Sequence, residues 1–132
     1  YHAVSIALRF PDKFNRCVGM SGPYDFAQMS GPYSVFNWVF DYYDETVNVC
    51  NPVPFVASIS NEDHLKKIRE MDIIFASGTT DPLFDGNQQL SHVLWEKDIW
   101  HAFRIWDGFA HDWPVWHDMV KHYIGGPDSG EY

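Results

Sequence analysis

The fold is decided by residues 72–106, which read DIIFASGTTDPLFDGNQQLSHVLWEKDIWHAFRIW. Asp72–Ser77 is a short apolar run that ends at Gly78, which is typical of a buried strand. Asn87–Lys97 places its apolar residues at helical spacing, and Ala102–Trp106 returns to a strand pattern. A strand, a helix and a second strand in this order form a right-handed crossover between parallel strands. The stretch therefore predicts a parallel β-sheet covered by helices.

The same alternation continues on both sides of this unit. Tyr1–Phe10 predicts a helix with apolar residues around most of its circumference, and Arg16–Met20 predicts another buried strand. A further helix is expected to open at Ser60, where Asp63 completes a capping box, and a last helix at Pro114. We therefore predict an α/β fold of parallel strands alternating with helices. Three apolar strands make a small sheet, so we expect the central sheet to be incomplete.

Residues 23–58 interrupt this alternation. No strand or helix pattern runs through them, and we expect an irregular, cap-like excursion from the sheet. Six aromatic residues lie between 33 and 43, where they either cap the core or form an aromatic wall over a substrate pocket. Asn51–Pro54 is interpreted as a rigid extended connector. We place the domain at residues 1–124 and expect a flexible tail at 125–132.

The composition excludes several classes of function. The 132 residues carry a formal net charge of −9, so we expect no binding to nucleic acid or to an anionic membrane surface. No apolar run approaches the roughly 20 residues that span a bilayer. Two cysteines, Cys17 and Cys50, are too few for a disulfide framework or a cysteine-based zinc site. We therefore expect a reducing, cytoplasmic location and no cofactor.

Candidate catalytic residues lie in loops that follow the predicted strands. Ligands of an open parallel sheet bind at the carboxyl ends of its strands, and the loops there include Asp81 and His111. We expect these two side chains to meet in space, because a carboxylate orients the histidine of nucleophilic hydrolases. Each also has a structural interpretation, with Asp81 as the start of a turn and His111 as an ordinary loop histidine. Asp112 is either an alternative acid or the N-cap of the last helix.

The chain offers no clear nucleophile. Ser21 follows a predicted strand, but Gly19-Met20-Ser21-Gly22-Pro23 lacks the second glycine spacing of a Gly-x-Ser-x-Gly elbow. We interpret Ser21 as a turn residue that lines the substrate pocket, together with Phe109 and Trp113. Cys17 lies within a predicted strand and is expected to be buried and unreactive.

Five blocks of the chain resemble esterases of the α/β-hydrolase fold, in the group that includes the esterase D and antigen 85 type enzymes. The blocks are Tyr1–Phe14, Gly19–Gly22, Asn51–Val53, Gly78–Asp81 and Gly108–Pro114. They extend over nearly the whole chain to about Ile124, and the last block is the most specific. The resemblance implies the C-terminal portion of an α/β-hydrolase and a serine carboxylic-ester hydrolase activity.

The resemblance also implies roles and partners. Asp81 is implied as the acid of a catalytic triad and His111 as its general base, with the nucleophilic serine about four residues before Tyr1. The chain is thus expected to be the C-terminal half of its domain and to act on a small-molecule ester. Its expected partner is the N-terminal half, in the same or in a second chain. The exposed edge of the sheet would otherwise favour self-association.

Two other functions fit parts of the sequence. The six tryptophans and seven tyrosines, with Trp106, Trp113 and Trp116 foremost, would suit a non-catalytic binding module for a carbohydrate or a protein partner. A metal site would draw on the histidines and acids of residues 111–122. That segment lacks a ligand spacing typical of metal proteins, and we expect no metal.

Overall fold

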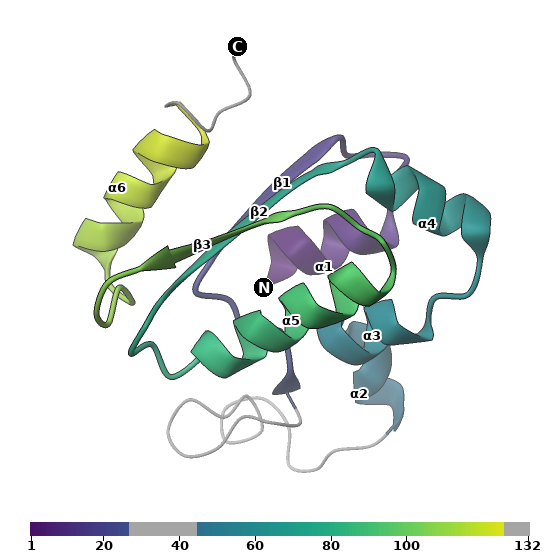
Figure 1. Cartoon of the computed structure of the whole chain (residues 1–132), viewed down its shortest axis with the longest axis horizontal. Helices are drawn as coiled ribbons and strands as arrows, with labels where there is room; N and C mark the ends of the chain where they lie inside the picture. Colours follow the sequence, from purple (N-terminus) through teal and green to yellow (C-terminus); the bar gives the residue numbers. More distant parts are fainter. Residues whose placement is uncertain (27–44, 126–132) are drawn as a thin grey trace.

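The computed structural model describes residues 1–26 and 45–125. Its helices are α1 (His2–Arg9), α2 (Glu45–Cys50), α3 (Pro52–Ser58), α4 (Glu62–Arg69), α5 (Phe84–Glu96) and α6 (Trp113–Tyr123). Its strands are β1 (Arg16–Met20), β2 (Asp72–Gly78) and β3 (Ala102–Trp106) (Figure 1). Within these residues, no helix is long and apolar enough to cross a membrane. The predicted aromatic segment 33–43 and the tail from residue 126 lie outside the described residues.

The three strands form one parallel sheet in the order β1-β2-β3. Arg16 of β1 pairs with Asp72 of β2, and Ile74 of β2 pairs with Ala102 of β3. Each crossover between neighbouring strands contains helices, as connections between parallel strands usually do. The predicted α/β fold of parallel strands alternating with helices is confirmed. In the described part of the chain β1 and β3 are the two edges, so the sheet is not closed.

The side chains of β2 alternate between two apolar layers. Ile73 and Phe75 pack into a layer with residues of α1, α3, α4 and α5, whereas Ile74 and Ala76 pack with residues of α6. Figure 1 shows α6 on one side of the sheet and α1 and α5 on the other. The alternation follows from the two-residue period of a strand. Because both of its faces are covered, β2 is apolar almost throughout.

Helix α1 buries one face rather than most of its circumference. Val4, Ala7 and Leu8 are buried at the i, i+3, i+4 spacing of a helix face. Ile6 is 44% exposed and Phe10 is 52% exposed, so the expectation that this helix, apolar around most of its circumference, is nearly all buried is wrong. Ile6 instead lines an apolar groove of about 420 Å³ between α1, β1 and α6.

Residues 45–50 and 52–58 are helical rather than irregular, which corrects the predicted excursion in this part. Pro52 lies in the first turn of α3, where the missing N–H needs no partner within the helix. Asn51 is extended, with φ −84° and ψ 114°, and its Oδ1 accepts a hydrogen bond from Phe26 N–H at 3.0 Å. The extended connector predicted at Asn51–Pro54 therefore ends at Asn51. Val56, which is fully buried, packs α3 into the core.

Helices α4 and α5 begin close to their predicted starts. The Asn61 side chain caps α4 by accepting a hydrogen bond from His64 N–H at 3.0 Å, so the cap predicted at Ser60 is one residue too early. α5 begins at Phe84 rather than at Asn87. Both differences lie within the usual uncertainty of helix ends read from local patterns.

Candidate active site

The loops that follow β1, β2 and β3 gather at the carboxyl edge of the sheet (Figure 1). A short turn joins α1 to β1, and α1 packs against that strand, so the N-terminal end of α1 lies at the same edge. Ligands bind at this edge in open parallel sheets. The candidate site is therefore built from these three loops.

Asp81 is held in the loop after β2. The Asp81 N–H donates a hydrogen bond to the Gly78 carbonyl at 3.1 Å. The N–H of the preceding residue, Thr80, donates to the Gly108 carbonyl at 3.0 Å. The Asp81 side chain is fully buried, and its Oδ1 accepts a hydrogen bond from Leu83 N–H at 2.8 Å. That last bond closes a turn of the kind predicted for Asp81. The turn also fixes the direction of the carboxylate.

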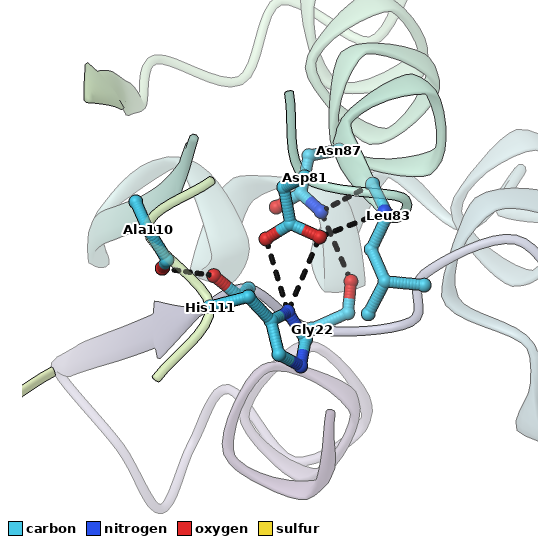
Figure 2. A network of polar contacts seen from close by, with 7 residues as sticks. Gly22, Asp81, Leu83, Asn87, Ala110 and His111 are labelled. Atoms are coloured by element: carbon cyan, nitrogen blue, oxygen red, sulfur yellow. Dashed lines mark hydrogen bonds and ion pairs between the residues drawn. The ribbon is translucent and has the colours of Figure 1, made fainter. Parts of the chain in front are cut away.

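His111 contacts this carboxylate from the loop after β3 (Figure 2). The Nδ1 atom lies 3.1 Å from Asp81 Oδ2 and 3.2 Å from Asp81 Oδ1. An ionised carboxylate can only accept a hydrogen bond, so Nδ1 carries the proton and donates it. In this tautomer Nε2 is the nitrogen that can accept a proton from another group. The Asp81 side chain is fully buried, so its carboxylate is shielded from water. The His111 side chain is 20% exposed, so the imidazole is not fully enclosed.

Two residues of the loop that carries His111 have positive backbone φ angles. Gly108 has φ 77° and Ala110 has φ 45°. Glycine adopts positive φ readily, whereas alanine does so only with strain. Gly78 ends β2, and a Cβ there would overlap the carbonyl oxygens of Gly108 and Phe109. The end of β2 and the His111 loop therefore pack backbone against backbone.

Ser21 reaches the same loop from the end of β1. It has φ 47° and is 4% exposed. Its N–H donates to the Ala76 carbonyl at 2.7 Å, and its Oγ donates to the Ala110 carbonyl at 3.3 Å. The buried hydroxyl thus contacts the backbone of the residue before His111.

Aromatic rings flank the imidazole of His111. The ring of Phe109 has its centroid 5.8 Å from that of His111, and Trp116 meets His111 edge to face at 5.1 Å. Trp113 packs on Trp116 at 5.3 Å. Phe109 is 44% exposed and Trp113 is 70% exposed. The structure therefore places Phe109 directly beside His111 and Trp113 one ring further away, both with much of their surface in solvent.

The sequence prediction missed Asn87. This residue is fully buried, and its Nδ2 donates to the Gly22 carbonyl at 3.0 Å and to the Leu83 carbonyl at 2.8 Å (Figure 2). It links the loop after β1 to the loop that carries Asp81. A signal was present, because Asn87 lies three residues before Leu90, on the stripe of α5 that faces the core.

Asp112 has the structural role that was one of its two interpretations. Its Oδ1 accepts a hydrogen bond from Val115 N–H at 3.3 Å, which makes it the N-cap of α6. Pro114 lies in the first turn of that helix, which begins at Trp113, one residue before the predicted start. Asp81 is the acid that contacts Nδ1 of His111.

The described residues give no support to a metal centre or to Cys17 as a nucleophile. In residues 1–26 and 45–125, no three side chains of His, Cys, Asp or Glu are grouped so that they could hold a metal ion. Cys17 is buried, and this burial, together with the nearby charge of Asp72, raises the pKa of its thiol to about 12. The thiol is therefore protonated at neutral pH and is a poor nucleophile.

The chain matches no protein-family model and no curated protein. Among solved structures it is similar to a ferulic acid esterase, with a TM-score of 0.71 over 89% of this chain at 24% sequence identity. The match covers 42% of the esterase chain, so the present chain spans less than half of that length. At this identity the similarity shows the fold alone. The fold is an esterase-like α/β fold, consistent with the C-terminal portion of an α/β-hydrolase.

Proposed function

We propose that this chain is part of a serine carboxylic-ester hydrolase of the esterase D and antigen 85-like group. The observation that carries the proposal is the contact between the buried Asp81 carboxylate and Nδ1 of His111. The contact lies at the carboxyl edge of a parallel sheet, where ligands bind. In a histidine held in this way the acid fixes the proton on Nδ1, so Nε2 is the nitrogen that can accept a proton.

In this proposal His111 is the general base and Asp81 is the acid of the triad. Nε2 of His111 takes the proton of a serine hydroxyl as the serine oxygen attacks the ester carbonyl. The same nitrogen then returns the proton to the leaving alcohol, which leaves an acyl-enzyme. In the second half of the reaction, Nε2 takes a proton from a water molecule that attacks the acyl-enzyme and returns it to the serine oxygen as the acid is released. The Asp81 carboxylate keeps the proton on Nδ1 and stabilises the imidazolium that forms between these steps.

The nucleophilic serine is proposed to precede α1. The proposal is supported by the N-terminal end of α1, which lies at the same edge of the sheet as the loop that carries His111. A nucleophile elbow lies between a strand and the helix that follows it. In this arrangement α1 is that helix, and its strand belongs to the N-terminal half of the domain.

We propose that the N-terminal half, in the same or in a second chain, covers the side of the sheet beyond β1. β1 is an edge of the described sheet, and the apolar groove between α1, β1 and α6 runs beside it. Phe14 and Ile124, which line this groove, are 42% and 59% exposed. An exposed strand edge with an apolar groove beside it favours pairing with another strand. Without that half, self-association at this edge is the expected outcome.

The proposed substrate is a small-molecule ester. The open rings of Phe109 and Trp113 flank the His111 region, where a flat substituent of the ester would stack. The name of the similar structure, a ferulic acid esterase, agrees with an aromatic acyl group. Comparison of aromatic with aliphatic acyl esters of one alcohol tests this part of the proposal.

The test of the proposed function is ester hydrolysis by the complete protein with Asp81→Asn and Asp85→Asn compared. Asp81→Asn removes the charge that orients His111, and we expect kcat to fall about 10³-fold or more. Asp85 lies exposed in the first turn of α5, so the same substitution there is expected to leave kcat within about twofold. An Asp81→Asn enzyme with more than a tenth of the original kcat contradicts the proposal.

A second candidate is a non-catalytic binding module for a carbohydrate or a protein partner. It is favoured by Trp113, whose side chain is 70% exposed. Such a module would bind glycans at equilibrium and lose that binding in Trp113→Ala. The esterase proposal predicts no binding of simple glycans, so calorimetric titration with them separates the two functions.

A further inference from the structure

Two strained residues from different loops meet beside His111. Ser21, after β1, and Ala110, after β3, have φ values of 47° and 45°. Residues other than glycine rarely adopt this conformation, and it persists where surrounding contacts maintain it. Ser21 and Ala110 are both buried, 4% and 7% exposed, and they contact each other through a hydrogen bond.

That hydrogen bond connects the core of the sheet to the candidate base. The Ser21 N–H donates to the carbonyl of Ala76 in β2 at 2.7 Å, which fixes Ser21 against the central strand. Its Oγ donates to the Ala110 carbonyl at 3.3 Å. The peptide unit that contains this carbonyl leads directly into His111. Its orientation therefore sets the direction in which the imidazole leaves the loop.

We propose that Ser21 is a positioning residue for His111. Its hydroxyl holds the Ala110 carbonyl and so maintains the strained conformation in which Nδ1 of His111 meets the Asp81 carboxylate. This role differs from the contact with substrate that the sequence predicted for Ser21, and it rests on the hydrogen bond from the hydroxyl to the Ala110 carbonyl. The catalytic consequence rests on the proposed function, whereas the positioning of the imidazole does not.

Ser91 provides a matched control in the same molecule. Its hydroxyl lies 2.7 Å from Nε2 of a buried histidine, His101, whose Nδ1 lies 2.9 Å from the Ile99 carbonyl. A carbonyl can only accept, so Nδ1 of His101 carries a proton, as does Nδ1 of His111. Each of the two histidines thus has an Nδ1 proton held by a hydrogen bond. Ser21 contacts the carbonyl of the residue before His111, and Ser91 contacts the ring of His101 itself.

The experiment compares Ser21→Ala with Ser91→Ala in the complete protein. Alanine is as strained as serine at positive φ, so Ser21→Ala removes the hydroxyl without adding strain. We expect kcat for ester hydrolysis to fall about tenfold with KM within about twofold, because a misplaced base slows chemistry rather than binding. In spectra of protein with ¹⁵N-labelled histidine, exchange of the His111 Nδ1 proton with water should become several times faster. The His101 signal should be unchanged.

Ser91→Ala should give the opposite pattern, with a changed His101 signal, an unchanged His111 signal and an unchanged kcat. The positioning role is overturned if a folded Ser21→Ala protein keeps both its kcat and its His111 proton signal. It is also overturned if KM rises at constant kcat, which would make Ser21 a substrate ligand. If Ser21→Ala does not fold, Ser21→Gly removes the same hydroxyl and relieves the strain at φ 47°. A protein without esterase activity refutes the proposed function, but the proton signal still decides the role of Ser21.

Discussion

His101 precedes strand β3 in the chain and His111 follows it. The two histidines differ in burial and in the charge of the groups that contact their rings. His101 comes just before the strand, at its buried amino end, and is 4% exposed. Its ring stacks on Phe75 at 5.4 Å. Its ring nitrogens contact a hydroxyl and a carbonyl, both of which are neutral. Burial favours the neutral imidazole of His101, and neither of these two partners supplies a counter-charge to an imidazolium.

His111 comes after the strand and has a carboxylate as its partner. A carboxylate can stabilise an imidazolium, and the His111 side chain is 20% exposed. The comparison shows that hydrogen bonds on a histidine do not by themselves indicate catalysis. Two features distinguish the candidate base from a structural histidine. Its partner is charged, and it follows the carboxyl end of a parallel strand instead of preceding the amino end.

The largest effect that tests this comparison is the loss of activity in His111→Ala. We expect kcat/KM for ester hydrolysis by the complete protein to fall about 10³-fold or more, because the general base is removed. His101→Ala should retain activity within about threefold once the protein is folded. Comparable losses in the two variants would remove the distinction between the histidines.

The free energy of unfolding should fall more in His101→Ala than in His111→Ala, the reverse of the order expected for activity. His101→Ala removes a large buried ring from its stack on Phe75, and we expect the free energy of unfolding to fall by about 2–4 kcal/mol. His111→Ala should cost less, about 1–2 kcal/mol, because its side chain is 20% exposed but its removal takes a hydrogen bond from the buried Asp81 carboxylate. Denaturant unfolding of both variants measures the difference. An equal loss of stability in the two would contradict the assigned roles.

The pH dependence of stability should also depend on His101. Burial lowers the pKa of His101 below its ordinary value of 6.5, and the hydrogen bond to the Ile99 carbonyl opposes this only in part. The unfolded chain therefore binds the proton first as the pH falls. The contribution of His101 to the free energy of unfolding is complete above pH 6.5, declines below it, and levels off below the lowered pKa.

This effect is measured by denaturant unfolding at several values between about pH 8 and pH 5. His101→Phe keeps a ring against Phe75 but cannot take up a proton, so its stability should decline less steeply with falling pH. A slope identical to that of the parent protein would show that His101 is not the group responsible.

The smallest expected effect distinguishes the two acids next to His111. Asp112→Ala removes the N-cap of α6 and should lower the free energy of unfolding by about 1 kcal/mol. Its kcat should stay within about threefold of the parent value, since the cap acts on α6 rather than on Nδ1 of His111. A loss of activity as large as that of Asp81→Asn would return Asp112 to the role of triad acid.

The sequence predicted the parts of the molecule that follow simple periods. β2 was predicted at Asp72–Ser77 and is observed at Asp72–Gly78, because a strand covered on both faces is apolar throughout. The proximity of Asp81 and His111 followed from the rule that the carboxyl ends of parallel strands share one edge. Neither inference needed knowledge of the loops themselves.

The parts that were missed depend on contacts that local patterns do not encode. α3 contains Pro52 and Pro54, which read as an extended connector, yet the packing of Val56 and the place of Pro52 in the first turn allow a helix. Positive φ at Ser21 and Ala110 had no signal in residue type, since glycine is the usual residue there. Such strain becomes visible only when both loops are in place.

The most direct test of the central claim is labelling of the complete protein with a fluorophosphonate probe, which reacts with activated serines. The labelled residue is located by mass spectrometry of peptides. We expect one labelled serine upstream of Tyr1, with a labelling rate that falls about a hundredfold or more in His111→Ala and is retained in His101→Ala. Labelling at Ser21, no labelling, or equal rates in the two histidine variants would contradict it.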